Sequence, residues 1–232
     1  MRLQNSQPPP ACIEALQRRR WTCVPDFLHE DSAHALESCL LHDVPWGLAY
    51  RLNSQPVTDL QAADTNSLAP DIRRQLLEQQ GEPFQFVYNT YMMVTAYLER
   101  RHPELLLNRV LEWLNSPMML AYFRRLTGVS GIAKLNAQAT RYLPGHFLKN
   151  HNDYNSDEGR RFAYVLGLTR HWRPDWGGLL HFTDEHGQVR DTVVPAFNTL
   201  TIFCVPQDHF VSYVAPFAEH PRLAITGWLL DK

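Results

Sequence analysis

Residues 133–151 read AKLNAQATRYLPGHFLKNH. They form two short runs rich in strand-forming residues, separated by a Pro-Gly turn, and this alternation of short strands and turns is the pattern that predicts the fold. It continues to position 230, as short runs rich in Val, Ile, Thr and aromatic residues between clusters of Pro, Gly, Asn and Asp. About eight such runs at close spacing are typical of an all-β sandwich, barrel or jelly roll. We therefore predict a mainly β core over residues 131–230.

The first 130 residues carry mostly helical patterns. Apolar side chains recur at helical spacing in three segments, residues 31–42, 103–114 and 116–127. The first helix has Asp31 and Ser32 as candidate caps, and Pro stands in the first turn of the other two. Residues 43–68 are predicted to be a loop with at most a short strand at 46–52, and residues 84–94 alternate like a strand.

The length and charge of the chain limit its organisation and partners. A chain of 232 residues with 44% hydrophobic residues can bury one sizeable core, which excludes a disordered chain. We predict a single α+β domain over 1–232, with helical support and substrate-covering segments in 1–130. The 22 Lys and Arg nearly cancel the 24 Asp and Glu, so we expect neither direct nucleic-acid binding nor attraction to an anionic membrane.

The four cysteines, Cys12, Cys23, Cys39 and Cys204, form no C-x-x-C pair. This spacing favours neither a disulfide framework nor a cysteine zinc site, and it fits a reducing compartment. The N-terminal residues lack the apolar stretch of a secretory signal, and no apolar run approaches the ~20 residues needed to span a bilayer. We therefore predict a soluble cytoplasmic protein.

The sequence His151-Asn152-Asp153 ends one of the predicted strands. Side chains at positions i and i+2 of a strand lie on the same face, so the imidazole and the carboxylate can converge on one point. His209, in the run HFVSYVA, can supply a third ligand if its strand lies beside theirs. Two histidines and one carboxylate form the facial triad of non-haem Fe(II) sites, which leaves coordination positions open.

The H-x-D pattern is weak alone, because a second copy, His29-Glu30-Asp31, occurs where a helix is predicted to begin. In that copy a helix-capping role is sufficient to explain Asp31. The structural alternative for His151 and Asp153 is a turn with exposed polar side chains at the end of a strand. The metal interpretation therefore depends on residues of the neighbouring strands.

Arg222 opens the apolar run RLAITGWLL near the C-terminus. A buried arginine must be paired, and its planar guanidinium suits bidentate binding of a carboxylate ligand. The alternative is an arginine at the mouth of a barrel, paired with Asp208 or Glu219. Tyr142 lies on the run that precedes the metal pair, where its phenol can donate a hydrogen bond to a second carboxylate.

The order of the motifs is specific as a set. They are Tyr142 with Pro144-Gly145, His151-x-Asp153, Gly159-Arg160-Arg161, Trp176-Gly177-Gly178, Pro195-Ala-Phe-Asn198, His209 and Arg222-x-x-x-Thr226-Gly227-Trp228. Together they resemble the 2-oxoglutarate/Fe(II)-dependent dioxygenases, in the prolyl-hydroxylase branch. Over residues 110–230 the chain looks most like the catalytic domain of the ribosomal-protein prolyl 3-hydroxylases.

The resemblance implies a double-stranded β-helix, or jelly roll, and an Fe(II) ion held by His151, Asp153 and His209. It implies 2-oxoglutarate and O2 as co-substrates, with ascorbate as a candidate reductant. Arg222 is expected to bind the distal carboxylate of 2-oxoglutarate. The implied reaction is hydroxylation of a prolyl residue in a protein, with release of succinate and CO2. Because the carboxylate ligand is present, hydroxylation is favoured over halogenation.

One position departs from the family pattern. Family members commonly carry a tyrosine that also holds the distal carboxylate, and the matching position here is Gly167. Tyr164 is three positions away and is expected to face the other side of its strand. We expect Tyr142, Thr226 or a water molecule to replace the missing contact, or the pocket to be larger.

The motifs do not define the substrate. Residues 46–52 and 84–93 are candidates to close over the iron. Four of their side chains are candidates for a peptide groove, although burial accounts equally well for the tyrosines: Tyr50, Arg51, Tyr88 and Tyr91. Two other functions stay open, a hydroxylase of a free amino acid or other small metabolite, and a non-catalytic jelly-roll binding module.

Overall fold

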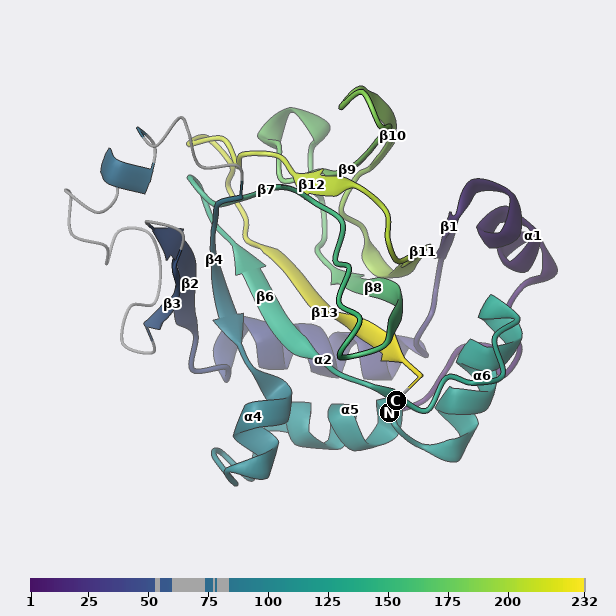
Figure 1. The fold of residues 1–232 in the computed structure, drawn as a ribbon. Coiled ribbons are helices and arrows are strands. Elements are labelled where there is room, and N and C mark those ends of the chain that lie inside the picture. Colours follow the sequence, from purple (N-terminus) through teal and green to yellow (C-terminus); the bar gives the residue numbers. More distant parts are fainter. Residues whose placement is uncertain (53–54, 60–73, 77, 79–83, 232) are drawn as a thin grey trace.

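The computed structural model describes residues 1–52, 55–59, 74–76, 78 and 84–231 (Figure 1). The described helices are α1 (Pro10–Arg19), α2 (Glu30–His42), α4 (Met93–Leu98), α5 (Leu106–Leu114), α6 (Pro117–Thr127) and the 3-10 turn Pro174–Trp176. The strands are β1 (Trp21–Val24), β2 (Gly47–Leu52), β3 (Gln55–Asp59), β4 (Phe86–Tyr91), β5 (Lys134–Leu135), β6 (Gln138–Tyr142), β7 (Phe147–His151), β8 (Arg160–Leu168), β9 (Leu180–Thr183), β10 (Val189–Val193), β11 (Phe197–Cys204), β12 (His209–Val211) and β13 (Arg222–Leu230). No helix in this described part has the length and apolar character needed to cross a membrane.

The strands form one antiparallel sheet that curls back on itself. Its order is β1-β11-β8-β13-β6-β4-β7-β12-β9-β10, and β4 pairs with β6 through residues 89–91 and with β7 through Phe86 and Val87. The small sheet of β7, β12, β9 and β10 therefore lies across from β8, β13 and β6, as Figure 1 shows. This arrangement confirms the predicted double-stranded β-helix with supporting N-terminal helices.

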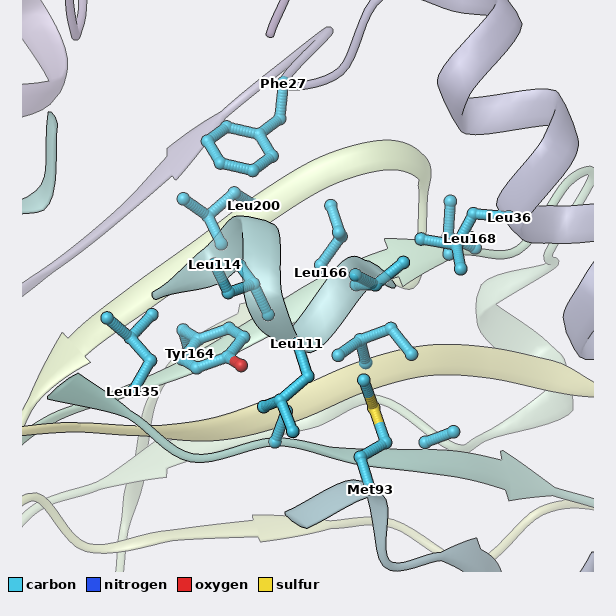
Figure 2. Packing of buried hydrophobic residues seen from close by; sticks show 14 of the residues in the cluster. Phe27, Leu36, Met93, Leu111, Leu114, Leu135, Tyr164, Leu166, Leu168 and Leu200 are labelled. Carbon is cyan, nitrogen blue, oxygen red and sulfur yellow. The ribbon is translucent and has the colours of Figure 1, made fainter. Parts of the chain in front are cut away.

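The helices cover the outer face of the larger sheet. Alternate residues of β8 face them because side-chain direction alternates along a strand, and Figure 2 shows Tyr164 and Leu166 near Leu111 and Leu114 of α5, and Leu168 beside Leu36 of α2. Burying each such leucine stabilises the fold by roughly 1.5–3 kcal/mol. The opposite face of β8 is left to line the interior of the curled sheet.

Helix α6 begins and ends as the sequence predicts. The Ser116 side chain accepts a hydrogen bond from the Met119 amide at the N-terminus. Gly128 follows the last turn with φ +73°, a left-handed conformation that glycine adopts without strain. Pro117 occupies the first helical position, where its missing N–H leaves no bond unmade.

The capping prediction for Asp31 is wrong. Helix α2 begins at Glu30, because the carbonyl of His29 already accepts bonds from the Ser32 and Ala33 amides. Asp31 therefore lies inside the first turn, where its carboxylate pairs with Arg2 at 2.9 Å. The helix has no side-chain cap at its N-terminus.

Two other boundaries differ from the sequence predictions. Helix α5 begins at Leu106, three residues after Pro103, so this proline precedes the helix. The segment predicted as a strand over 84–94 forms β4 only from Phe86 to Tyr91, and α4 starts at Met93. The alternating aromatic side chains thus predicted the strand correctly, but the apolar residues after Tyr91 were wrongly assigned to it and begin helix α4 instead.

The prediction of a loop over 43–68 is wrong for Gln55–Asp59, which forms β3 against β2. Among the described strands β3 pairs only with β2, so Pro56 interrupts no central ladder. Positions 53–54 and 60–68 of the same prediction lie outside the described residues. Strand β1, which pairs with β11 at the other end of the sheet, was also missed because it is only four residues long.

Candidate metal and co-substrate site

Neighbouring strands of the small sheet bring three predicted residues together. His209 on β12 pairs directly opposite His151 on β7, and their ring centroids are 4.1 Å apart. Asp153 follows β7, with Oδ1 at 3.3 Å from His151 Nε2 and Oδ2 at 3.5 Å from His209 Nε2. The three donor atoms all lie within 4.8 Å of one another. The spacing-based prediction of convergence is therefore met in the structure.

Backbone carbonyls fix the orientation of both imidazole rings. His151 Nδ1–H donates to the Lys149 carbonyl at 2.9 Å, and His209 Nδ1–H donates to the Gln207 carbonyl at 2.7 Å. A neutral ring held in this way presents its Nε2 lone pair, which is the usual second-shell arrangement of metal-binding histidines. Two imidazole lone pairs and a carboxylate thus point at one place, and this donor set fits a divalent metal ion.

Burial and neighbouring charge set the protonation of the site. Burial, with the charge of His151, lowers the pKa of His209 to about 4. Burial raises the pKa of Asp153, but hydrogen bonding to His151 and the charges of both histidines outweigh it and hold that pKa below its usual value. At neutral pH the site thus offers an ionised carboxylate and a neutral His209, as metal binding requires.

Arg222 begins β13 and lies opposite Tyr142 of β6 in the strand register. Only 5% of its surface is exposed, and among the described residues its buried Nη1 has no hydrogen-bond partner. Neither Asp208 nor Glu219 forms an ion pair with it, so the alternative structural role is not observed. The guanidinium lies 4.9 Å from the Tyr142 ring centroid. Burying a cation without an anionic partner costs desolvation free energy, and a bound carboxylate ligand would offset this cost by pairing with the guanidinium.

One cavity of about 410 Å³ joins these groups. Its lining includes the three candidate metal ligands and the predicted co-substrate residues Arg222, Tyr142 and Thr226. The volume is within the range of small-molecule sites in proteins. The cavity therefore holds a candidate metal site and an arginine that can bind an acid group.

An aromatic wall closes one side of the cavity. Phe84, Phe86 and Tyr88 alternate along β4 and the residues before it, with neighbouring ring centroids 5.6 and 5.5 Å apart. Tyr88 stacks on Tyr142 at 5.2 Å, and burial raises the pKa of Tyr88 to about 12. Phe84 also packs 5.2 Å from the His151 ring. The period-two alternation could have identified both phenylalanines, which the sequence analysis did not single out.

The other candidate groove residues lie elsewhere. Tyr50 belongs to a separate buried cluster with Leu48, Leu76 and Val87, and Tyr91 hydrogen-bonds to His102 at 3.2 Å. The Arg51 guanidinium stacks over the Phe84 ring at 5.4 Å and is not part of the cavity lining. Of the four predicted groove residues, Tyr88 alone lines the cavity.

At Gly167, where family members commonly carry a tyrosine, the backbone of Ala196 occupies the space that a side chain would need. An ideal Cβ placed on Gly167 would lie 2.5 Å from the Ala196 carbonyl oxygen, so a side chain has no room there. The expectation of a larger pocket at this position is therefore not met. Tyr164 faces the helix-covered core, as strand alternation predicts, and donates to the Asn136 carbonyl at 2.9 Å.

Two histidines and one carboxylate that converge in this way form the donor set typical of non-haem Fe(II) oxygenases. Residues 137–230 match the family model of the 2OG-Fe(II) oxygenase superfamily.

A curated relative is prolyl 3-hydroxylase OGFOD1 of Mus musculus, which is 34% identical over 115 residues. This match covers 47% of the present chain and 21% of the mouse protein. The matched segment thus spans about a fifth of that relative's length.

Solved structures share the fold over nearly the whole chain. A prolyl-4-hydroxylase from Pseudomonas putida has a TM-score of 0.60 at 20% identity, covering 96% of this chain and 98% of that one. A prolyl hydroxylase from Trichoplax adhaerens, solved with a hypoxia inducible factor peptide fragment, has a TM-score of 0.58 at 17% identity, covering 95% and 87%. At these identities the likeness concerns the fold.

Proposed function

We propose that this chain hydroxylates a prolyl residue of a protein or peptide, with Fe(II) held by His151, Asp153 and His209. The observation that carries the proposal is one cavity that contains both this donor set and Arg222, whose buried Nη1 has no partner among the described residues. The prolyl substrate is supported by the 34% identity to a mouse prolyl 3-hydroxylase.

The residues around Arg222 are suited to hold 2-oxoglutarate. Arg222 would bind the distal carboxylate, and Tyr142 and Thr226 line the same cavity as further hydrogen-bonding groups. Burial raises the pKa of Tyr142, which keeps its phenol protonated and able to donate to an anion. Fe(II) with 2-oxoglutarate and O2 supplies the oxidation, in which 2-oxoglutarate becomes succinate and CO2 and one oxygen atom enters the substrate C–H bond.

The aromatic wall determines which substrates fit. The rings of Phe84, Phe86 and Tyr88 line the cavity, and an apolar aromatic surface suits a compact apolar ring such as the prolyl side chain. The same side chains keep water away from the reacting centre, where uncoupled oxidation would otherwise occur. Substrate identity then depends on residues at the mouth of the cavity.

The metal assignment is tested by 2-oxoglutarate turnover to succinate, with Fe(II) and ascorbate. His151→Ala and Asp153→Ala should abolish turnover because each removes one of three ligands. Two matched controls should retain it: His181→Ala, whose ring bonds to Thr192 and Ser212, and Asp157→Ala, whose side chain is exposed. Wild-type turnover in the His151 and Asp153 variants would refute the assignment.

The substrate assignment needs a separate measurement. The enzyme is incubated with proline-containing peptides and with pools of free amino acids and metabolites, and the products are analysed by mass spectrometry. Addition of one oxygen atom to a peptide proline supports the proposal. Oxygen on free amino acids or metabolites, with unmodified peptides, would show instead that the substrate is a small molecule.

A further inference from the structure

Asp153 has a backbone conformation that its surroundings must hold. Its φ of +62° lies in the left-handed region, which residues other than glycine seldom occupy. Aspartate tolerates this region better than most residues, but such a conformation persists only where neighbouring groups fix it. The direction of the Asp153 carboxylate depends on this backbone, so whatever fixes the backbone also fixes the donor atom.

Arg160 contacts Asp153 from the start of β8. Its Nη1 donates a hydrogen bond to the Asp153 carbonyl at 3.3 Å. Its Nε donates to Glu158 at 2.9 Å, and the guanidinium carbon lies 3.7 Å from the centroid of the Trp228 ring. The Glu158 carboxylate and the Trp228 ring together fix the plane of the Arg160 guanidinium. In this plane the Nη1–H group points at the Asp153 carbonyl.

A β-bulge brings Arg160 to this position. Leu229 of β13 pairs with Phe162, but Leu230 pairs with Arg160, so Arg161 is an extra residue in β8. Without the bulge Arg160 would share the face of Phe162, which packs against the helices. The inserted residue turns Arg160 to the cavity side, where it forms part of the lining.

We propose that Arg160 is a positioning residue that holds Asp153 in its metal-binding orientation through the backbone carbonyl. This inference rests on the proposed metal site. It assigns to Arg160, within the Gly159-Arg160-Arg161 motif, a role at the metal centre that does not require contact with metal or substrate. Glu158 and the Trp228 ring act as braces that keep the Arg160 guanidinium in place.

The test is the affinity of the metal-free chain for Mn(II), measured by calorimetry without 2-oxoglutarate or substrate. Arg160→Gln should weaken Mn(II) binding about 10- to 100-fold, the range known for groups that orient metal ligands. Arg161→Gln is the matched control, because it removes the same charge one residue away. Arg161 is half-exposed and pairs with Asp231 at 3.6 Å, so its loss should leave Mn(II) affinity unchanged.

Two further variants keep the test decisive. Glu158→Ala removes a brace whose side chain is 43% exposed, so it should fold even if Arg160→Gln does not, and it should weaken Mn(II) binding by a smaller factor. Arg160→Lys keeps the charge but loses the planar stack on Trp228, and should lie between wild type and Arg160→Gln.

The possible outcomes separate this inference from the proposed function. Wild-type protein that binds no Mn(II) would refute both. Wild-type binding with equal affinity in the Arg160→Gln variant would refute only the role of Arg160. A raised KM for peptide with unchanged Mn(II) affinity would show that Arg160 contacts the substrate, which also overturns the inference.

Discussion

Gly167 illustrates how a single residue is fixed by its neighbours. Because the Ala196 carbonyl oxygen would lie 2.5 Å from an added Cβ, Gly167→Ala should destabilise the fold by about 1–3 kcal/mol through overpacking. Urea unfolding of the variant measures this loss. Gly131→Ala is the control, since an added Cβ there meets no atom within 4 Å. Equal stability of both variants would show that β11 can move away from Gly167.

At the scale of single residues, the sequence predicted part of the candidate metal and co-substrate site. The spacing of His151 and Asp153 led us to expect their convergence, but the structure achieves it differently, because β7 ends at His151 and Asp153 lies beyond the strand with a φ of +62°. Arg222 was correctly expected to need an anion. The contact between Arg160 and Asp153 could not be predicted, because it depends on a bulge in the pairing of two strands that are distant in sequence. Likewise nothing local indicates that the Ala196 carbonyl fills the space beside Gly167.

At the scale of elements, α6 depends on its N-terminal cap. Ser116→Ala removes the acceptor for the Met119 amide and should cost about 1 kcal/mol of unfolding free energy. Ser116→Asp keeps an acceptor at the same position and adds a favourable charge at the helix N-terminus, so it should retain wild-type stability. Thermal unfolding of the two variants compares them. Wild-type stability of Ser116→Ala would indicate that α6 is held by packing alone.

Elements were predictable where local signals agreed. Helix α6 has proline at its first position and glycine after it, and both act as expected, whereas the capping role of Ser116 was not predicted. Helix α2 lacks a side-chain cap, so the capping rule placed its start wrongly. Strand β3 contains Pro56 and polar residues, and it exists because β2 supplies a partner rather than because of its own pattern.

At the scale of the whole molecule, metal binding should stabilise the fold. The candidate ligands lie on β7, β12 and the loop after β7, so their geometry exists only in the folded chain. At a free Mn(II) concentration of 100 times Kd the gain is about 2.7 kcal/mol. The melting temperature should therefore rise with Mn(II) and fall again with a chelator. Asp153→Ala should show neither change, and an equal rise in that variant would place the ion elsewhere.

Trp228, which stacks under Arg160, is the tryptophan that lines the cavity in the described part of the chain. Its indole lines the same cavity as the candidate ligands, so a paramagnetic ion bound there should quench the Trp228 share of the emission from the six tryptophans. Partial quenching of intrinsic fluorescence should therefore report metal loading in solution without an added dye.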